Sequence, residues 1–125
     1  MKHDSLADVF SILKNMEDIG RKQAQVPSSK VGEGVLKIMQ KHKYIGKYSK
    51  EKSNKIKVDL EGRINNCNVI KPRFSVKKDD FIKWEKRFLP ASNTGILILT
   101  TTKGVMDHQT AKKEQVGGQL LGFVY

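Results

Sequence analysis

A short polar run that could bind an anion follows the most apolar stretch of the chain. Gly95–Leu99 is a turn glycine followed by four consecutive aliphatic residues, which is typical of a strand buried on both faces. The polar run consists of Thr100, Thr101, Thr102, Lys103 and Gly104. Threonine hydroxyls can donate to a phosphate or a sugar, the lysine adds positive charge, and glycine lets a partner backbone come close. The pattern indicates a rigid strand that presents polar groups to an anionic partner, although a plain strand-to-helix connection would have the same composition.

Two other places could contact a nucleic acid. Gly117 and Gly118 follow a helical pattern, and consecutive glycines either stop a helix or allow close backbone approach. Trp84 lies next to Lys83 and is followed by Lys86 and Arg87. A tryptophan among cations can stack on a base or a sugar, but the same indole could be partly buried in the core. The sequence leaves both alternatives open.

The residues that usually carry catalysis are scattered. His3, His42 and His108 lie far apart in the sequence, and Cys67 has no basic neighbour that would activate a thiol. Asp107 precedes His108 at the start of a helical pattern, where helix capping explains the aspartate better than a catalytic pair does. No sequence motif of a hydrolase, a nucleotide-binding loop or a zinc protease occurs. We therefore expect no enzyme activity, no catalytic residue, no cofactor and no metal.

The charge balance points to a polyanion as partner. The chain has 125 residues with 24 Lys and Arg against 13 Asp and Glu, a net charge of +11. A small domain with such an excess most often binds nucleic acid. A membrane surface is a less favoured partner, since no basic amphipathic helix and no long apolar run occur. The single cysteine excludes an intrachain disulfide, and the N-terminal residues do not resemble a signal peptide, so we expect a cytosolic protein.

The first 65 residues predict a small α/β lobe. A capping Asp4 or Ser5 would start a helix that runs to about Asn15. A serine after Pro27 would start a second helix, and three strands complete the lobe. The predicted elements are helix 5–15, strand 21–26, helix 29–41, strand 43–48 and strand 55–60. In the last strand, apolar and charged residues alternate strictly, which indicates one buried face. His42 fits the C-terminal end of the second helix, where a cation is favoured.

Residues 66–125 predict a second, mainly β lobe with one helix. Strands are expected at 68–73, 81–89, 95–101 and 118–125, of which 81–89 fits neither helical nor strand periodicity well. Asp107 would start the helix and Gly117 would end it. The whole chain is therefore predicted to be an α+β protein of two small lobes, residues 1–65 with the order α-β-α-β-β and residues 66–125 with mainly antiparallel strands.

Several of these stretches resemble one known family. The segments TTTKGVMDHQTAKK and VGGQLLGFVY, in this order, are similar to the C-terminal signature of the universal small-subunit ribosomal protein eight (S-eight) family. DSLADVFSILKN resembles the first helix of that family, and PSSK its turn before the second helix. NNCNVIKPRF and WEKRFLP resemble the archaeal and eukaryotic branch. The resemblance covers nearly the whole chain.

The resemblance implies a structural protein of the small ribosomal subunit that works in the cytoplasm. Members bind the central domain of small-subunit ribosomal RNA early in assembly, mostly through the C-terminal lobe, and adjoin other small-subunit proteins; no small-molecule substrate is implied. On this chain the RNA-binding residues would be Thr100, Thr101, Thr102, Lys103, Gly104, Gly117, Gly118 and Gln119, with Ser28, Ser29 and Lys30 from the N-terminal lobe and Lys83 and Trp84 as further candidates.

Two departures from the family pattern bear on the site, and one alternative function stays open. The hydroxyl triplet is all threonine where serine is usual at its ends, and Gln119 stands where bacterial members carry glutamate. The added methyl groups narrow the fit, and the amide changes the hydrogen bonding. The alternative function is a free RNA-binding repressor of the chain's own messenger, which the same surface could serve.

Overall fold

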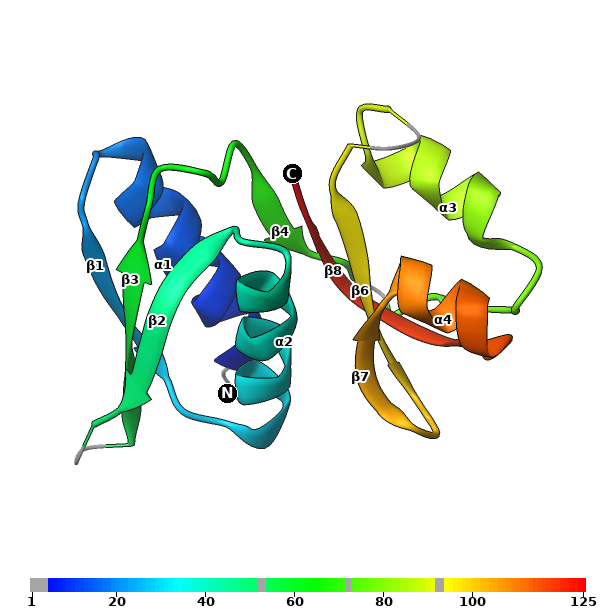
Figure 1. Ribbon diagram of the computed structural model, residues 1–125, viewed down its shortest axis with the longest axis horizontal. Coiled ribbons are helices and arrows are strands. Elements are labelled where there is room, and N and C mark those ends of the chain that lie inside the picture. The colour runs from blue at the N-terminus through cyan, green and yellow to red at the C-terminus, as the bar shows by residue number, and fades with distance from the viewer. Residues whose placement is uncertain (1–4, 52–53, 72, 92–93) are drawn as a thin grey trace.

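Two sheets and four helices form alternating layers. The computed structural model describes residues 5–51, 54–71, 73–91 and 94–125. A three-stranded sheet forms one outer layer, two helices pack between it and a second sheet, and two more helices lie on the far side of that second sheet (Figure 1). The first half contains α1 (Ser5–Asp18), β1 (Gln23–Pro27), α2 (Lys30–Lys41), β2 (Ile45–Lys50) and β3 (Lys55–Leu60). The predicted α-β-α-β-β order and the α+β class are thus confirmed.

The second half supplies the second sheet and its outer helices. Its elements are β4 (Cys67–Val69), β5 (Ser75–Val76), α3 (Phe81–Phe88), β6 (Ile96–Thr101), β7 (Gly104–Asp107), α4 (His108–Glu114) and β8 (Gly118–Val124). The strands follow the order β4-β8-β6-β7 with β5 paired to β8, and all described pairings are antiparallel. No helix within the described ranges is long and apolar enough to cross a membrane.

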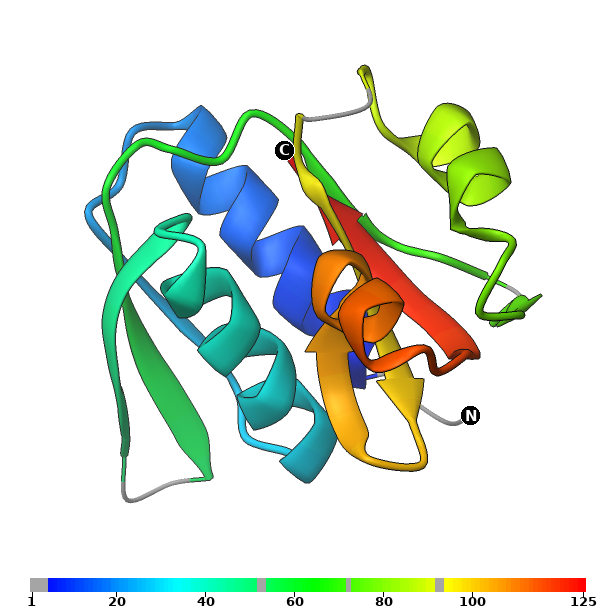
Figure 2. The same cartoon turned by 45° about the vertical axis from the view of Figure 1, so that its right-hand side comes forward.

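The three-stranded sheet buries one face against the helices, as its alternating sequence predicted. Its order is β1-β3-β2, and Ile56 and Val58 of the central strand are almost fully buried. Lys57, which lies between them, and Asp59 point to the other face of the sheet and are more exposed. Figure 2 shows α1 and α2 running side by side between this sheet and the second one. Burial of these aliphatic side chains stabilises the layer by about 25 cal/mol for each Å² of apolar surface removed from water.

Strand β6 is buried on both of its faces, as its unbroken aliphatic run predicted. Ile96 and Ile98 belong to an inner cluster of side chains that α1, α2 and the three-stranded sheet complete. Leu97 and Leu99 belong to an outer cluster under α3 and α4. Successive side chains of a strand point to opposite faces, so a strand between two helical layers must be apolar at every position. The inner cluster takes side chains from both predicted lobes and packs them into one body.

The segment 81–89 forms a helix, so the predicted strand is wrong. Phe81, Trp84 and Glu85 are the buried residues of α3, and Phe88 completes their helical spacing. Glu85 is charged yet only 6% exposed. Because a charged residue occupies one of the buried positions, the apolar residues of this segment do not show a clear helical period in the sequence. The second half therefore carries two helices, α3 and α4.

Other boundaries also differ from the prediction. Helix α1 extends to Asp18, beyond the expected end at Asn15, and β4 ends at Val69. Helix α4 ends at Glu114, where Gln115 adopts a left-handed conformation, so Gly117 does not close it. Ser29 and Asp107 cap their helices as expected, and Cys67 is buried. Asp4 and Pro72 lie outside the described residues.

A buried polar cluster joins α3 to α4. The Glu85 carboxylate lies 2.8 Å from Nε2 of His108 and accepts a 2.6 Å hydrogen bond from Lys112. The backbone N–H of Leu97 donates to Nδ1 of His108 over 3.0 Å. Nδ1 therefore carries no proton, and the neutral ring donates its Nε2 proton to Glu85. Burial lowers the pKa of His108 below its usual range, although the negative charge of Glu85 opposes the shift.

We expect Leu99→Ala to lower the free energy of unfolding by about 2–5 kcal/mol, because the side chain is fully buried and its loss leaves a cavity. Ile82→Ala is the matched control, since Ile82 is 62% exposed, and it should change stability by about 0.5 kcal/mol or less. Urea unfolding followed by circular dichroism measures both. Equal losses in the two variants would contradict the assignment of β6 to the core.

The neutral state of His108 predicts that the fold weakens in mild acid. In the unfolded chain this residue takes up a proton at about pH 6.5. In the folded chain its pKa is lower, so protonation requires a lower pH. Stability contributed by this residue is therefore present above about pH 6.5 and is lost as the pH falls below it. The variant His108→Gln should be less stable than the parent protein, but its unfolding midpoint should fall less steeply as the pH is lowered below about 6.5. An identical decline in both proteins would show that His108 is not the group responsible.

Candidate nucleic-acid interface

The predicted hydroxyl loop is the turn of a β-hairpin, because the strand β7, which the sequence did not predict, lies between it and α4. Strands β6 and β7 pair antiparallel, with Thr101 opposite Gly104 at the turn. Gly104 has φ +113°, a conformation that disfavours residues with a side chain. This positive φ returns the chain along β6 before α4 begins. The hairpin places Thr102 and Lys103 at an exposed tip.

The three threonines differ in what their hydroxyls do. The Thr101 hydroxyl accepts a 3.0 Å hydrogen bond from the backbone N–H of Lys103 and donates to the carbonyl of Gly104 over 3.0 Å. It is therefore used to hold the turn. Thr102 is exposed, and within the described part of the chain its hydroxyl has no hydrogen-bond partner. Thr100 is half-buried and lines a groove beside α2.

The glycine pair lies against the base of this hairpin. A Cβ atom at Gly118 would overlap the carbonyl oxygen of Thr100, and one at Gly117 would overlap the carbonyl oxygen of Val76. These glycines therefore let β8 begin directly against its neighbours. Gln119 pairs with Thr100 across β6 and β8, so the structure brings the predicted glycine and hydroxyl segments together at one end of the sheet.

The segment Ser28–Lys30 reaches the same end of the molecule from the N-terminal half. Ser29 caps α2 by accepting a 3.0 Å hydrogen bond from the N–H of Gly32, and the N–H of Ser28 donates to the carbonyl of Asn54. The start of α2 and the tip of the β6–β7 hairpin both lie at the lower edge in Figure 1. Lys30 is exposed there and lines the same groove as Thr100, Lys103 and Gly104.

This groove, of about 850 Å³, runs between α2 on one side and β7 with α4 on the other. Four lysines line it, namely Lys30, Lys37, Lys41 and Lys103. Its two acidic groups both have partners: Glu114 lies 3.8 Å from Lys103, and Asp107 is bound as described below. Lys37 and Lys41 reach the groove because α2 packs beside β7, which brings this helix to face the hairpin.

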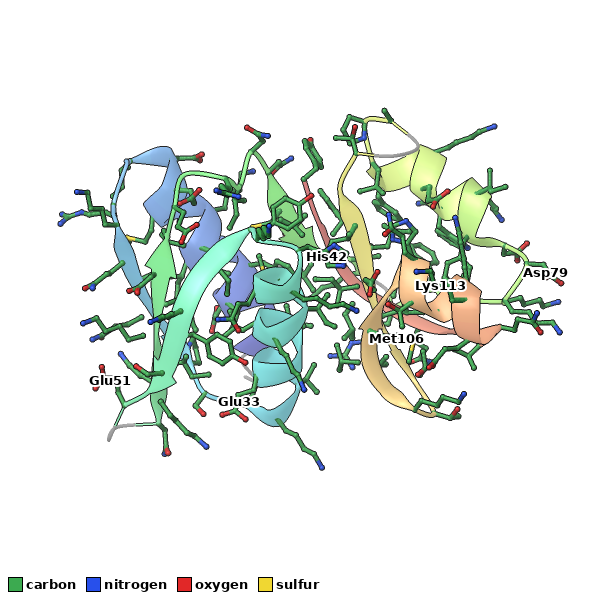
Figure 3. All side chains as sticks on the ribbon, viewed as in Figure 1. Glu33, His42, Glu51, Asp79, Met106 and Lys113 are labelled. Atoms are coloured by element: carbon green, nitrogen blue, oxygen red, sulfur yellow. The ribbon has the colours of Figure 1, made fainter. Side chains whose placement is uncertain are left out.

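His42 and Asp107 join the two halves at the end of this groove. Asp107 is 1% exposed, accepts hydrogen bonds from the hydroxyl and the N–H of Thr110, and lies 3.3 Å from Nε2 of His42 without hydrogen-bond alignment. Burial alone would raise the pKa of Asp107, but the Thr110 hydrogen bonds and the nearby His42 outweigh it, and the pKa is lowered. His42 follows the last turn of α2, as predicted, and Figure 3 shows it at the boundary between the two halves. Asp107 thus caps α4, and its contact with His42 connects the end of α2 to the start of α4.

Lys83 and Trp84 do not join this surface. They lie on α3, across the five-stranded sheet from α2 (Figure 1). Trp84 is only 6% exposed and packs between Phe74 and Phe88, with ring centroids 4.8 and 6.3 Å away. This burial favours core packing over base stacking for the indole. Lys83 is exposed, with its ammonium 5.2 Å from the Trp84 ring centre.

The grouped side chains suit recognition of an anion. Lysine ammonium groups, a free threonine hydroxyl and closely approachable backbone all contact phosphates and sugars in protein–RNA complexes. Within the described ranges, no three His, Cys, Asp or Glu residues are grouped so that they could hold a metal ion. We refer below to Ser28–Lys30, Thr100–Gly104 and Gly117–Gln119 as the hairpin face.

Comparison with known proteins gives one consistent result. Residues 4–125 match the family model described as ribosomal protein S8. Small ribosomal subunit protein uS8 of Methanococcoides burtonii is 49% identical over 98% of this chain and 97% of its own length. Protein uS8A of Saccharomyces cerevisiae is 48% identical over 96% of this chain and 95% of its own, and uS8 of Picrophilus torridus is 45% identical over 100% of both. The chain therefore belongs to the ribosomal protein S8 family, in agreement with the resemblance seen in its sequence.

Proposed function

We propose that this protein is a structural component of the small ribosomal subunit and binds ribosomal RNA through the hairpin face. The relatives that match this chain over nearly their whole length are named small ribosomal subunit proteins. The observation that carries the proposal is the meeting of the predicted glycine, hydroxyl and Ser28–Lys30 segments at one end of a protein with net charge +11. We assign its binding site to the central domain of the small-subunit ribosomal RNA. The protein works in the cytoplasm, beside other small-subunit proteins.

Affinity comes first from the lysines that line the groove. Each ammonium that neutralises a phosphate releases condensed counterions, so binding weakens as the salt concentration rises. Lys30, Lys37 and Lys41 project from one face of a single helix, and Lys103 faces them from the hairpin. Both walls of the groove can thus contact phosphates of one RNA backbone.

Specificity comes from the shape of the hairpin face. In A-form RNA the base edges are hidden in a deep groove, while the shallow minor groove displays 2′-hydroxyl groups. The free hydroxyl of Thr102 and the exposed backbone at Gly104, where no side chain blocks approach, suit contacts to such hydroxyl groups. The Thr101 hydroxyl contributes indirectly, because it fixes the turn that carries its neighbours. No catalytic step is part of this function.

Crosslinking to purified small-subunit ribosomal RNA tests the proposal directly. We expect ultraviolet crosslinks from the hairpin face to one region of the central domain, mapped by mass spectrometry on the protein and by sequencing on the RNA. Crosslinks spread evenly over the basic surface, or none to this RNA, would contradict the proposal. Cosedimentation of the cellular protein with small subunits separates it from a free repressor, which would remain in the soluble fraction with its messenger.

We expect Thr102→Val to weaken specific RNA binding about fivefold, since one hydrogen bond contributes about 1 kcal/mol. Thr101→Val should weaken it similarly and also lower the unfolding midpoint, because its hydroxyl makes two hydrogen bonds within the turn. Filter binding with specific RNA and with a random RNA measures both effects. Binding to random RNA should stay unchanged in each variant. If both variants bind the specific RNA as the parent does, the hydroxyl triplet lies outside the interface.

Lys103→Ala should flatten the plot of log affinity against log salt concentration by about one unit, because one phosphate contact is lost. Lys57→Ala is the matched control, since Lys57 lies on the outer face of the three-stranded sheet, far from the groove. Glu114→Gln removes the acidic partner of Lys103 and should strengthen binding at low salt. Equal slopes for the Lys103 and Lys57 variants would remove Lys103 from the set of phosphate contacts.

A further inference from the structure

A row of aromatic rings runs through the outer cluster beneath α3. The row consists of Phe74, Trp84, Phe88, Phe123 and Tyr125, and successive ring centroids are 4.8, 6.3, 5.8 and 6.0 Å apart. Three of the four contacts are stacked, with interplanar angles of 7°, 23° and 13°. Trp84 is buried, while the other four rings are half-buried at the surface. Such a row forms a rigid platform whose ring faces attract cations.

Arg87 lies on this platform. Its guanidinium carbon is 4.8 Å from the ring centre of Phe74, 5.5 Å from Trp84 and 5.4 Å from Phe88. The side chain is nevertheless exposed, and no carboxylate of the described residues pairs with it. By contrast, Lys50, Lys103 and Lys112 each contact a glutamate. The rings therefore hold the guanidinium in place while its N–H donors stay available for an anion.

The surroundings of Arg87 carry an excess of positive charge. The exposed basic residues on α3 and the segment before it are Arg73, Lys77, Lys78, Lys83, Lys86 and Arg87. The exposed acids of the same stretch are Asp79 and Asp80, which precede α3, and Figure 3 shows Asp79 at the outer end of the molecule. Glu85 is buried and is already bound by His108 and Lys112. We call the exposed basic residues of this stretch, centred on Arg87, the α3 face.

We infer that the α3 face binds the phosphate backbone of a second RNA segment, distinct from the one that the hairpin face contacts. The inference rests on the proposed RNA-binding function. The guanidinium of Arg87 has the fork geometry that matches two phosphate oxygens, and the neighbouring lysines can follow the backbone on either side. Trp84, which sequence reasoning placed in possible contact with a base, instead forms part of the platform beneath Lys83 and Arg87.

The composition of the α3 face favours RNA over a protein as the partner. Protein interfaces are built around apolar and aromatic side chains that become fully buried, with charges depleted at their centre. Among the described residues of α3 and the segment before it, Ile82 is the one exposed large apolar side chain, and Lys83, Lys86 and Arg87 share its helix. The face lies across the five-stranded sheet from α2 (Figures 1 and 2), and is therefore separate from the groove wall that carries Lys30, Lys37 and Lys41.

The test compares two RNAs and three variants. The RNAs are the whole small-subunit ribosomal RNA and the minimal fragment that the Arg87→Met variant, whose hairpin face is intact, protects from nuclease. Arg87→Met removes the charge but keeps an unbranched side chain over the rings, Arg87→Lys keeps the charge without the fork, and Lys57→Met is the matched control. Unfolding midpoints of all proteins establish that each is folded.

We expect Arg87→Met to weaken binding to the whole RNA about tenfold and to flatten its salt dependence by about one unit, while leaving binding to the minimal fragment unchanged. Arg87→Lys should keep the salt dependence and lose part of the affinity. Lys57→Met should match the parent on both RNAs. If Arg87→Met binds the whole RNA as tightly as the parent does, the α3 face has another partner, such as an acidic protein, and the inference is overturned.

Equal weakening on both RNAs would also overturn the inference, because Arg87 would then act on the first site. Failure of the proposed function gives a different result, since the parent protein itself would bind neither RNA with specificity. The two failures can therefore be told apart within one set of measurements.

Discussion

The arrangement of the whole molecule depends on one strand that must be hidden from water on both faces. Strand β6 directs Ile96 and Ile98 to one side and Leu97 and Leu99 to the other, and each pair needs its own covering layer. The inner layer of α1 and α2 and the outer layer of α3 and α4 meet this need. Because α2 is thereby held beside β7, its lysines come to face the hairpin. The groove is a consequence of how β6 is buried.

The boundary between the core and the candidate interface falls within a single strand. At Thr100 the aliphatic residues of β6 give way to hydroxyl-bearing ones, and the strand continues beyond the layers that cover it. The hairpin is anchored at its base by buried leucine and isoleucine side chains and fixed at its tip by the Thr101 hydroxyl. A group held this way loses little conformational freedom on binding. A larger share of the free energy of each contact therefore contributes to affinity.

The features that were predictable from sequence depend on local patterns, and those that were missed depend on distant partners. The aliphatic run of β6, the alternation in β3 and the caps at Ser29 and Asp107 each have a short-range signature. Helix α3 was mistaken for a strand because Glu85 occupies a buried position, and its partners His108 and Lys112 come more than twenty residues later. The hairpin was missed because β7 has only 4 residues, too few to show a clear strand period in the sequence. The family resemblance assigned residues from both halves to one RNA-binding surface, and of these Lys83 and Trp84 lie on α3, away from the others.

The position of β8 has a consequence for how the protein is made. This strand, Gly118–Val124, lies inside the second sheet and pairs with β4, β5 and β6. While a nascent chain is still short of these residues, β4 and β6 have no common neighbour, and their apolar faces have no complete cover. The sheet can therefore close only after residues 118–124 have left the exit tunnel, in one late and long-range step.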